Sequence, residues 1–417
     1  MSKGSPLERS DSQLAEHIVN EANQQESTLT LIASENHVSK AVMEAQGSVL
    51  TNRYAEGYPG ARYYGGEEYL DKIESLAIRR ATDLFGADHA NLQPHSGTQA
   101  NLAAYLALLD PGETVLAPSP HHTGHLSHGQ ATNVSSQLYE FEHYKVDSNS
   151  GYLDYDSIAE TAESVDPDLI VSGSSSYPRE FDFERMGKIA ADVDAYHVAD
   201  IAHIAGLVAA GSHQNPVDYA DVVTGSTHKT LKSGRGGFIL CSEVYSDAVD
   251  NAVFPGHQTG ALMHNIAGKA AGLSEALTSD FSDYATKVVR NAQLLGDIFV
   301  EENFTVVSRG TDKHFILVDV ADSDVEVSAA DATTALESVG IIVNETTIPG
   351  HQAGTSKGLR IGTPAITARG FDTDATRKVG SCMVEVLKSA QVAQQSAAIE
   401  ARVSDLCEQH PVYPAYK

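Results

Sequence analysis

The strongest constraint on the fold is a repeated alternation of short apolar runs and helical patterns between Val42 and Gly272. Each run ends abruptly in small polar residues, and its length and β-branched content predict a strand. Such runs are typical of strands buried on both faces of a mostly parallel sheet, and helices between them indicate an α/β layer architecture. The six predicted strands are Ala90–Gln93, Thr114–Ala117, Leu169–Ser172, Tyr196–Ala199, Val222–Thr224 and Phe238–Leu240.

The rest of the chain predicts an N-terminal arm and a small C-terminal α+β region. The predicted helices there are Leu14–Glu26, a long stretch from Ala261 past Leu295, and a closing helix from Asp374 to about Ser396. The apolar runs of the C-terminal region are Phe304–Ser308, Phe315–Val318 and Ile341–Val343. A chain of 417 residues exceeds one compact core, so we expect several domains. They are an arm (1–41), a large domain (42–272) and a small domain (273–417).

The net charge of −28 comes from scattered acidic residues and indicates an acidic, solvated surface. Such a surface disfavours nucleic acid and anionic membranes as partners, and it suits the salt-rich cytoplasm of a halophile. No apolar run approaches the roughly 20 residues of a membrane helix, and no apolar secretory segment opens the chain, so we expect a cytoplasmic protein. Cys241, Cys382 and Cys407 are too sparse for a disulfide framework or a zinc site.

Reactive residues follow four of the predicted strands, where ligands bind in open α/β sheets. After the first strand, Ser96 and Thr98 flank Gly97 at the start of an Ala/Leu-rich helix. Free N–H groups and the positive end of the helix dipole favour a phosphate there, although an ordinary helix cap is an equal alternative. We call Ser96, Gly97 and Thr98 the anion cup.

The second strand is followed by a loop with four histidines, His121, His122, His125 and His128. A metal site is disfavoured, because Pro120 and Gly124 prevent a helix between the histidines and no acidic ligand is near. A histidine that stacks on a flat cofactor ring is the preferred interpretation. His121 and His122 are expected to face water.

Asp200 and Lys229 follow the fourth and fifth strands. A carboxylate at the tip of a buried strand needs a partner, and a pyridinium N–H is one, with a helix cap or an ion pair as alternatives. Lys229 lies among Ser226, Thr227 and His228, whose polar groups could hold a phosphate and orient the amine. An aldehyde cofactor requires such an amine to form a Schiff base, although most lysines lie on the surface. In this order, the four features predict a pyridoxal phosphate enzyme.

Longer motifs along nearly the whole chain resemble the serine hydroxymethyltransferase family. They are LIASEN (Leu31–Asn36), LTNRYAEGYPGARYYGG (Leu50–Gly66), QPHSGTQAN (Gln93–Asn101), GHLSHG (Gly124–Gly129), SSSYPR (Ser174–Arg179), DIAHIAGLVAAG (Asp200–Gly211), STHKT (Ser226–Thr230), FPG (Phe254–Gly256), LMHNIAGKA (Leu262–Ala270) and GLRIGTPAITARGF (Gly358–Phe371).

The resemblance implies the fold of PLP-dependent transferases of the aspartate aminotransferase type. This is an α/β fold with a mostly parallel seven-stranded sheet in a large domain and a smaller α+β C-terminal domain. It also implies a homodimer or homotetramer with shared active sites, an amino-acid substrate, and transfer of a one-carbon unit from serine to tetrahydrofolate or another pterin. Lys229 would carry pyridoxal 5'-phosphate, and Asp200 would face its ring nitrogen.

The resemblance also implies roles for other residues. His125 would stack on the ring, with Ser175 and His203 near the phenolic oxygen. The phosphate contacts would be Ser96, Gly97, Thr98, His228 and, from the neighbouring subunit, Gly260. Ser34 and Arg360 would bind the substrate carboxylate, and Tyr63 would line the pterin site. Tyr54, Glu56 and Tyr64 would come from the partner chain, with Glu56 as acid/base. The expected catalytic set is Glu56, Tyr64, His228 and Lys229.

The chain departs from the usual family pattern at Thr123, Gly234, Thr259, Thr346 and the short loop Pro349–Lys357. These changes leave open a folate-independent β-hydroxy amino acid aldolase or transaldolase on the same scaffold. A non-catalytic binding homologue is a further alternative, against which the intact coenzyme residues argue.

Overall fold

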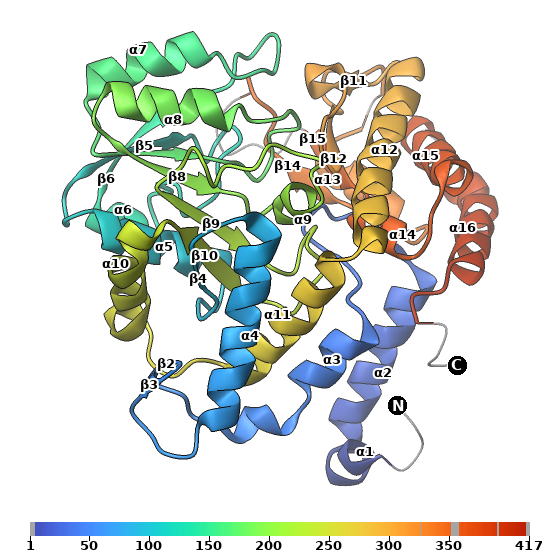
Figure 1. The fold of residues 1–417 in the computed structure, drawn as a ribbon. Helices are drawn as coiled ribbons and strands as arrows, with labels where there is room; N and C mark the ends of the chain where they lie inside the picture. Colours follow the sequence, from blue (N-terminus) through green and yellow to red (C-terminus); the bar gives the residue numbers. More distant parts are fainter. Residues whose placement is uncertain (1–4, 326, 352–357, 390–391, 414–417) are drawn as a thin grey trace. The chain divides into compact units, whose positions relative to one another are not determined.

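The computed structural model describes residues 5–325, 327–351, 358–389 and 392–413 (Figure 1). The chain forms two compact units. The first unit comprises Met1–His37, Lys287–Thr346 and Ser356–Lys417, and the second comprises Val38–Thr286 and Thr347–Thr355. The N-terminal segment thus groups with the C-terminal part of the chain, while the domain boundaries expected at residues 41 and 272 stay a prediction.

A seven-stranded sheet organises the second unit. Its strands are β4 (His89–Asn91), β5 (Thr114–Pro118), β6 (Glu140–Tyr144), β7 (Leu169–Ser172), β8 (Tyr196–Asp200), β9 (Val222–Ser226) and β10 (Gly237–Cys241), in the order β4-β10-β9-β8-β7-β5-β6. Only β10 runs antiparallel to its neighbours. This confirms the mostly parallel sheet and the six strands predicted from apolar runs, and it adds β6 at one edge.

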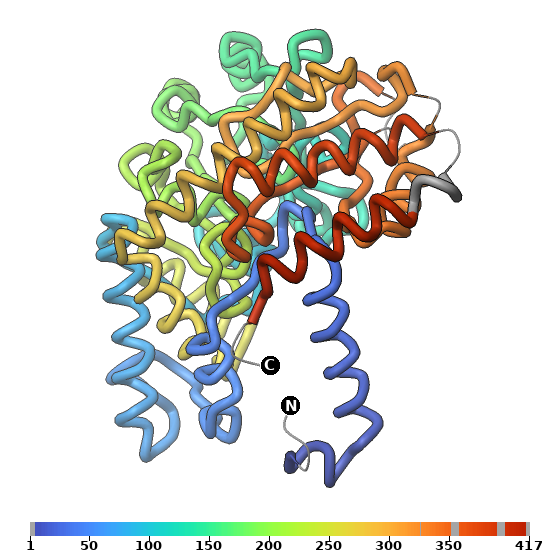
Figure 2. Tube along the Cα trace, turned by 90° about the vertical axis from the view of Figure 1, so that its right-hand side faces the viewer, coloured from blue at the N-terminus to red at the C-terminus, as the bar shows by residue number. Residues whose placement is uncertain are grey.

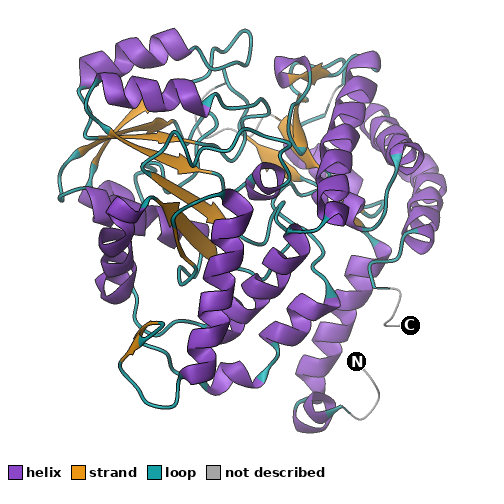
Figure 3. Cartoon of the chain, in the orientation of Figure 1, coloured by secondary structure: helices purple, strands orange, loops and turns teal. Residues whose placement is uncertain are grey.

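Helices cover both faces of this sheet (Figure 3). Those of the second unit are α3 (Lys40–Gln46), α4 (Glu68–Phe85), α5 (Gly97–Leu108), α6 (Ser135–Leu138), α7 (Tyr155–Val165), α8 (Phe183–Asp192), α9 (Ala205–Ala209), α10 (Ser246–Asn251) and α11 (Met263–Ala276). Alternate strand residues point to opposite faces. Val171 and Val198 pack against α5 and α10 in one core cluster, while their neighbours Ile170 and Ala199 are also buried. Burial of both sets explains the continuous apolar runs in the sequence.

Short elements complete the second unit. They are the antiparallel pair β2 (Gly57–Tyr58) and β3 (Ala61–Arg62), and the helical turns Val49–Asn52, Glu243–Tyr245 and Ala252–His257. In Figure 1 the β2–β3 pair lies beside the start of α4.

The first unit contains a four-stranded antiparallel sheet in the order β11-β12-β15-β14. Its strands are β11 (Thr305–Val306), β12 (Phe315–Asp319), β14 (Asn344–Thr346) and β15 (Gly358–Gly362), and a separate parallel pair joins β1 (Leu29–Thr30) to β13 (Ile341–Ile342). The helices are α1 (Pro6–Ser10), α2 (Ser12–Ser27), α13 (Ala329–Glu337), α14 (Pro364–Ala368), α15 (Thr373–Lys388), α16 (Val392–Gln409) and most of α12 (Ser279–Glu301).

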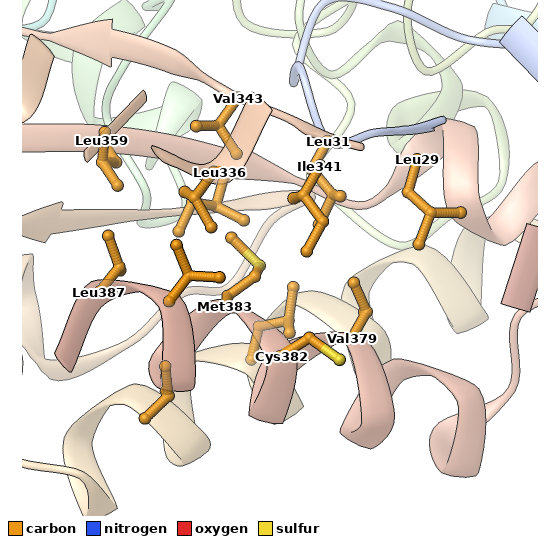
Figure 4. Packing of buried hydrophobic residues seen from close by; sticks show 14 of the residues in the cluster. Leu29, Leu31, Leu336, Ile341, Val343, Leu359, Val379, Cys382, Met383 and Leu387 are labelled. Atoms are coloured by element: carbon orange, nitrogen blue, oxygen red, sulfur yellow. The ribbon is translucent and has the colours of Figure 1, made fainter. Parts of the chain in front are cut away.

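The core of the first unit lies between its strands and α15. Figure 4 shows Val379 and Met383 of α15 facing Leu31, Leu336 and Ile341. The predicted closing helix from Asp374 to Ser396 was wrong, because α15 ends at Lys388 and a second helix begins at Val392. Residues 389–391 include neither Gly nor Pro, so no local signal marks the break. Both α15 and α16 bury apolar side chains in this core, which favours two helices over one continuous helix.

Helix α2 confirms the predicted amphipathic helix but buries little of its surface within its own unit. Figure 2 shows it extending away from the rest of that unit. Ala15 is its one buried residue, while Leu14 and Ile18 are 46% and 44% exposed. In the part of the chain that the structure describes, no helix combines the length and apolar character needed to cross a membrane.

Candidate active site

The site is built at the carboxyl ends of β8 and β9. Asp200 is the last residue of β8 and is 7% exposed, and its register partner in β9 is Thr224. Since β8 and β9 are parallel, the loop that leaves β9 and carries Lys229 begins at the same edge of the sheet. The two residues that the sequence singled out therefore follow neighbouring strands.

Asp200 is held by donors on both carboxylate oxygens. Nδ2 of Asn101 donates to Oδ2 over 2.8 Å, and the backbone N–H of Ala202 donates to Oδ1 over 2.8 Å. Nε2 of His128 lies 3.0 Å from Oδ2. Burial acts to raise the pKa of Asp200, but the hydrogen bond from His128, with smaller contributions from His125 and Asn101, holds the pKa well below its ordinary value. The carboxylate is therefore charged at neutral pH.

Hydrogen bonds fix the tautomer of His128. The backbone N–H of His125 donates to its Nδ1 over 3.2 Å, so Nδ1 carries no proton and Nε2–H is the donor to Asp200. Nδ1 of His125 lies 2.7 Å from Oγ of Ser127, which also accepts from Asn101. The histidine loop thus places His125 and His128 next to the strand-tip carboxylate.

The anion cup forms the N-terminus of α5. Oγ of Ser96 accepts from the backbone N–H of Gln99, as an N-cap does. A Cβ on Gly97 would lie 3.6 Å from Cβ of Ser226, so the cup packs against the end of β9. Two ring nitrogens in this region, Nε2 of His95 and Nδ1 of His228, are buried without a hydrogen-bond partner in the described part of the chain.

The loop that carries Lys229 is held by its own hydroxyl groups. Oγ of Ser226 donates to the carbonyl of Ala202 over 3.0 Å, and Oγ1 of Thr230 donates to the carbonyl of His203 over 2.9 Å. Oγ1 of Thr227 donates to the carbonyls of Gly234 and Gly236, so it supports the glycine loop that follows.

His228 is neutral in this environment. Burial, followed by the charges of Lys229 and Arg235, lowers its pKa to about 3. Its ring therefore carries no charge at neutral pH and remains a source of one hydrogen-bond donor and one acceptor.

Ser175 lies against the histidine loop. Its Oγ donates to the carbonyl of Gly124 over 3.0 Å, and its backbone N–H donates to the carbonyl of Thr123 over 3.1 Å. A Cβ on Gly124 would overlap the carbonyl of Pro118, so the loop requires glycine at this position. Thr123, one of the departures from the family pattern, is buried. Its hydrogen bond with Ser175 does not depend on the Thr123 side chain, because the backbone carbonyl is the acceptor.

The residues expected to act in a partner's site gather in a second cluster. Oη of Tyr64 donates to Oε2 of Glu56 over 3.3 Å, and the rings of Tyr54 and Tyr64 make an edge contact at 5.7 Å. A Cβ on Gly260 would lie 3.0 Å from the Tyr54 ring. Tyr63 is 70% exposed and contacts Phe254 in an edge geometry. The residues assigned to the partner's site thus occupy one region, although Gly260 is distant in sequence from the segment that carries Tyr54, Glu56 and Tyr64.

Ser34 and Arg360 belong to the first unit. Arg360 lies on β15, where its Nε donates to Oδ1 of Asn344 over 3.3 Å. Burial lowers its pKa to about 10, which leaves the guanidinium charged at neutral pH. The backbone N–H of Gly362 donates to the carbonyl of Leu31, and a Cβ on Gly362 would overlap Ala33, so the segment before Ser34 packs tightly on β15. Residues 352–357 of the Pro349–Lys357 loop lie outside the described residues.

The sequence patterns indicate no role for Asn101 and none for His128 beyond membership of the histidine loop. Both contact Asp200 in the structure. Their signal was present, since Asn101 lies one turn after the anion cup and His128 lies in the cluster of four histidines. The sequence patterns do not specify which residue of the helix after the anion cup, or of the histidine loop, contacts the carboxylate of Asp200.

Comparisons with known proteins agree with this geometry. A family model described as "Serine hydroxymethyltransferase" matches residues 7–383. Curated relatives with the same description include proteins of Halorubrum lacusprofundi (52% identity; 97% of this chain and 98% of the relative), Halobacterium salinarum (53%; 97% and 98%) and Haloarcula marismortui (52%; 98% and 99%). These relatives come from halophiles, in agreement with the acidic composition.

Proposed function

Because this chain belongs to the serine hydroxymethyltransferase family, we propose that Lys229 binds the carbonyl of pyridoxal 5'-phosphate and Asp200 pairs with its ring nitrogen. Members of this family interconvert serine and glycine, with tetrahydrofolate as the co-substrate. The coenzyme supplies an electron-withdrawing ring that accepts the electron pair released at the substrate α-carbon.

The residues present fit this coenzyme. The anion cup offers the unpaired N–H groups at the start of α5. His228 has a buried ring nitrogen with no partner among the described residues, which is the kind of group a phosphate oxygen satisfies. Ser96, Gly97, Thr98 and His228 would hold the phosphate.

One observation carries the proposal most directly, and it is the charge of Asp200. A buried carboxylate whose pKa is held far below its ordinary value stabilises a positive charge opposite it. A protonated pyridine nitrogen is such a charge. Asn101 and His128 orient the carboxylate, which would hold a protonated ring nitrogen in place.

The substrate contacts follow from the chemistry of two polar groups. We assign the amino-acid carboxylate to Arg360 and Ser34. The Arg360 guanidinium is charged and offers parallel N–H donors that match a carboxylate. His125 would stack on the coenzyme ring, and Ser175 and His203 would lie at its phenolic oxygen. Tyr63 would line the pterin site.

We further propose a homodimer or homotetramer in which each site takes Tyr54, Glu56, Tyr64 and Gly260 from a second copy. The exposure of Tyr54 (56%) and Tyr64 (49%) supports a covering partner. On helix α2, the exposed side chains of Leu14 and Ile18 provide further apolar surface for a second copy to cover. Burial and the carboxylate of Glu56 both raise the pKa of Tyr64, so the Tyr64 hydroxyl keeps its proton at neutral pH.

We infer a cytoplasmic location for the protein. Cys241, Cys382 and Cys407 are buried and unpaired, which suits a reducing compartment.

The assignment of Lys229 is tested by titrating the coenzyme into Lys229→Ala, with Lys232→Ala as the matched control. Lys232 is three residues further along the same loop, and its Nζ lies over the Tyr284 ring at 5.3 Å. We expect the visible absorption of lysine-bound coenzyme in the wild type and Lys232→Ala and its loss in Lys229→Ala. Retention of that absorption in Lys229→Ala would disprove the assignment.

A further inference from the structure

Lys269 is a buried cation on α11 to which the proposed mechanism assigns no role. It is 2% exposed, and its Nζ lies 2.7 Å from the carbonyl oxygen of Leu92, 3.0 Å from that of Pro94 and 2.8 Å from that of Gly237. Burial lowers the pKa of Lys269 to about 7, against the opposing charge of Glu74. Three carbonyl acceptors require three N–H donors, which only the protonated ammonium has.

The three carbonyls belong to the approach to the anion cup. Leu92 and Pro94 lead from the end of β4 to Ser96, and Gly237 is the first residue of β10. The carbonyl of Pro94 also accepts from the backbone N–H of Gly237 over 3.0 Å. A single ammonium therefore ties two neighbouring strands together immediately before the start of α5.

The carbonyl of Gln93, which lies between Leu92 and Pro94, is also held by a buried side chain. The carbonyl of Gln93 accepts from Nε2 of Gln258 over 2.8 Å. The carbonyls of Leu92, Gln93 and Pro94 thus all accept from buried side chains. A chain segment held by side-chain donors at three consecutive residues has little freedom to shift, which is the requirement for a preorganised anion site.

Two glycines make room for this arrangement. A Cβ on Gly236 would overlap Cε of Lys269, and a Cβ on Gly237 would overlap the carbonyl of Ser96. The carbonyl of Gly236 accepts from the backbone N–H and Oγ1 of Thr227, two residues before Lys229. The contacts of Lys269 therefore reach both the anion cup and the loop of the coenzyme lysine.

We propose that Lys269 is a positioning residue that holds the anion cup in place for the coenzyme phosphate, and so sets the preference for pyridoxal phosphate over pyridoxal. The inference rests on the proposed coenzyme site. Its buried charge adds a positive potential behind the cup, and its three hydrogen bonds fix the backbone that presents the N–H groups.

The test compares two ligands that differ only in the phosphate. Full-length wild type and Lys269→Met, prepared without coenzyme, are titrated with pyridoxal phosphate and with pyridoxal. We expect Lys269→Met to bind pyridoxal phosphate at least about tenfold more weakly, because hydrogen bonds from a charged donor are worth a factor of ten or more. The affinity for pyridoxal should change by less than about twofold, since that ligand makes no contact with the cup.

Arg80→Met is the matched control. Its guanidinium donates to the carbonyl of Ala270, the residue after Lys269, over 2.8 Å. The substitution removes a cation of α4 that contacts the helix of Lys269 without touching the approach to the cup, and we expect the wild-type ratio of the two affinities.

A second variant covers the case in which Lys269→Met does not fold. Gly236→Ala keeps the ammonium but displaces it, and we expect the same selective loss. A wild-type affinity ratio in folded Lys269→Met or Gly236→Ala, or equal losses for both ligands in these two variants, would overturn the inference. A failure of the proposed coenzyme site is distinguishable, because the wild type itself would then take up no coenzyme at Lys229.

Discussion

Nε2 of His128 lies 3.0 Å from Oδ2 of Asp200, and both side chains are buried at the carboxyl edge of the sheet. The contact joins residues 72 positions apart in the chain. His128 thereby donates to the carboxylate of Asp200, whose negative charge the proposed chemistry requires.

Asp200→Asn tests this charge while it preserves the shape of the side chain. We expect serine cleavage to fall by at least about 100-fold, because a preorganised charge is lost from the site. Coenzyme should still bind, since Lys229 and the anion cup are unchanged. Asp221→Asn is the control, because Asp221 precedes the amino end of β9 and bonds to Tyr245 and His197. Near-wild-type activity in Asp200→Asn would contradict the assignment.

The lowered pKa of His228 predicts that the protein loses stability in acid. Its pKa is about 3 in the folded protein and near 6.5 when unfolded, so the unfolded chain binds the extra proton between these values. The free energy of unfolding of the coenzyme-free protein should therefore fall as the pH drops below about 6.5, by a few kcal/mol in total. In His228→Asn this part of the decline should disappear. Identical pH profiles for the two proteins in denaturant titrations would show that His228 does not titrate as expected.

Shared sites predict complementation between two inactive chains. Lys229→Ala lacks the coenzyme lysine, and Glu56→Gln lacks the acid/base that each chain is proposed to lend to its partner. A mixed dimer contains one site with both groups intact, so random mixing should restore about a quarter of the wild-type activity. Activity no greater than the sum of the two separate variants would argue that each site uses its own Glu56.

Arg360→Lys should weaken binding of serine. Lysine keeps the charge but offers no parallel pair of donors, so we expect KM for serine to rise at least about tenfold with a smaller change in kcat. Arg309→Lys, on an exposed turn of the same unit, is the control. An unchanged KM in Arg360→Lys would remove Arg360 from the carboxylate site.

The sheet was predictable because its inner strands are buried on both faces. The runs around Ile170 and Ile239 are continuously apolar for that reason. The exception is β6, Glu140–Tyr144, an edge strand in which charged residues alternate with aromatic ones. An edge strand exposes part of its surface, so it has no uninterrupted apolar run to detect.

The sequence singles out the proposed coenzyme residues because each follows a strand, whereas the supporting contacts depend on the folded arrangement. Asn101 meets Asp200 across 99 positions of sequence, and Lys269 meets Leu92 across 177. A buried lysine at helical spacing has no pattern that distinguishes it from an exposed one. Only the three carbonyls around Nζ identify its place.

The most direct test of the account is to reduce the coenzyme-loaded protein with borohydride and to map the labelled peptide by mass spectrometry. We expect one pyridoxyl label, on Lys229 in the peptide that follows β9, and none on Lys232 or Lys269. A label on a different lysine, or no label after reduction, would contradict the assignment of Lys229.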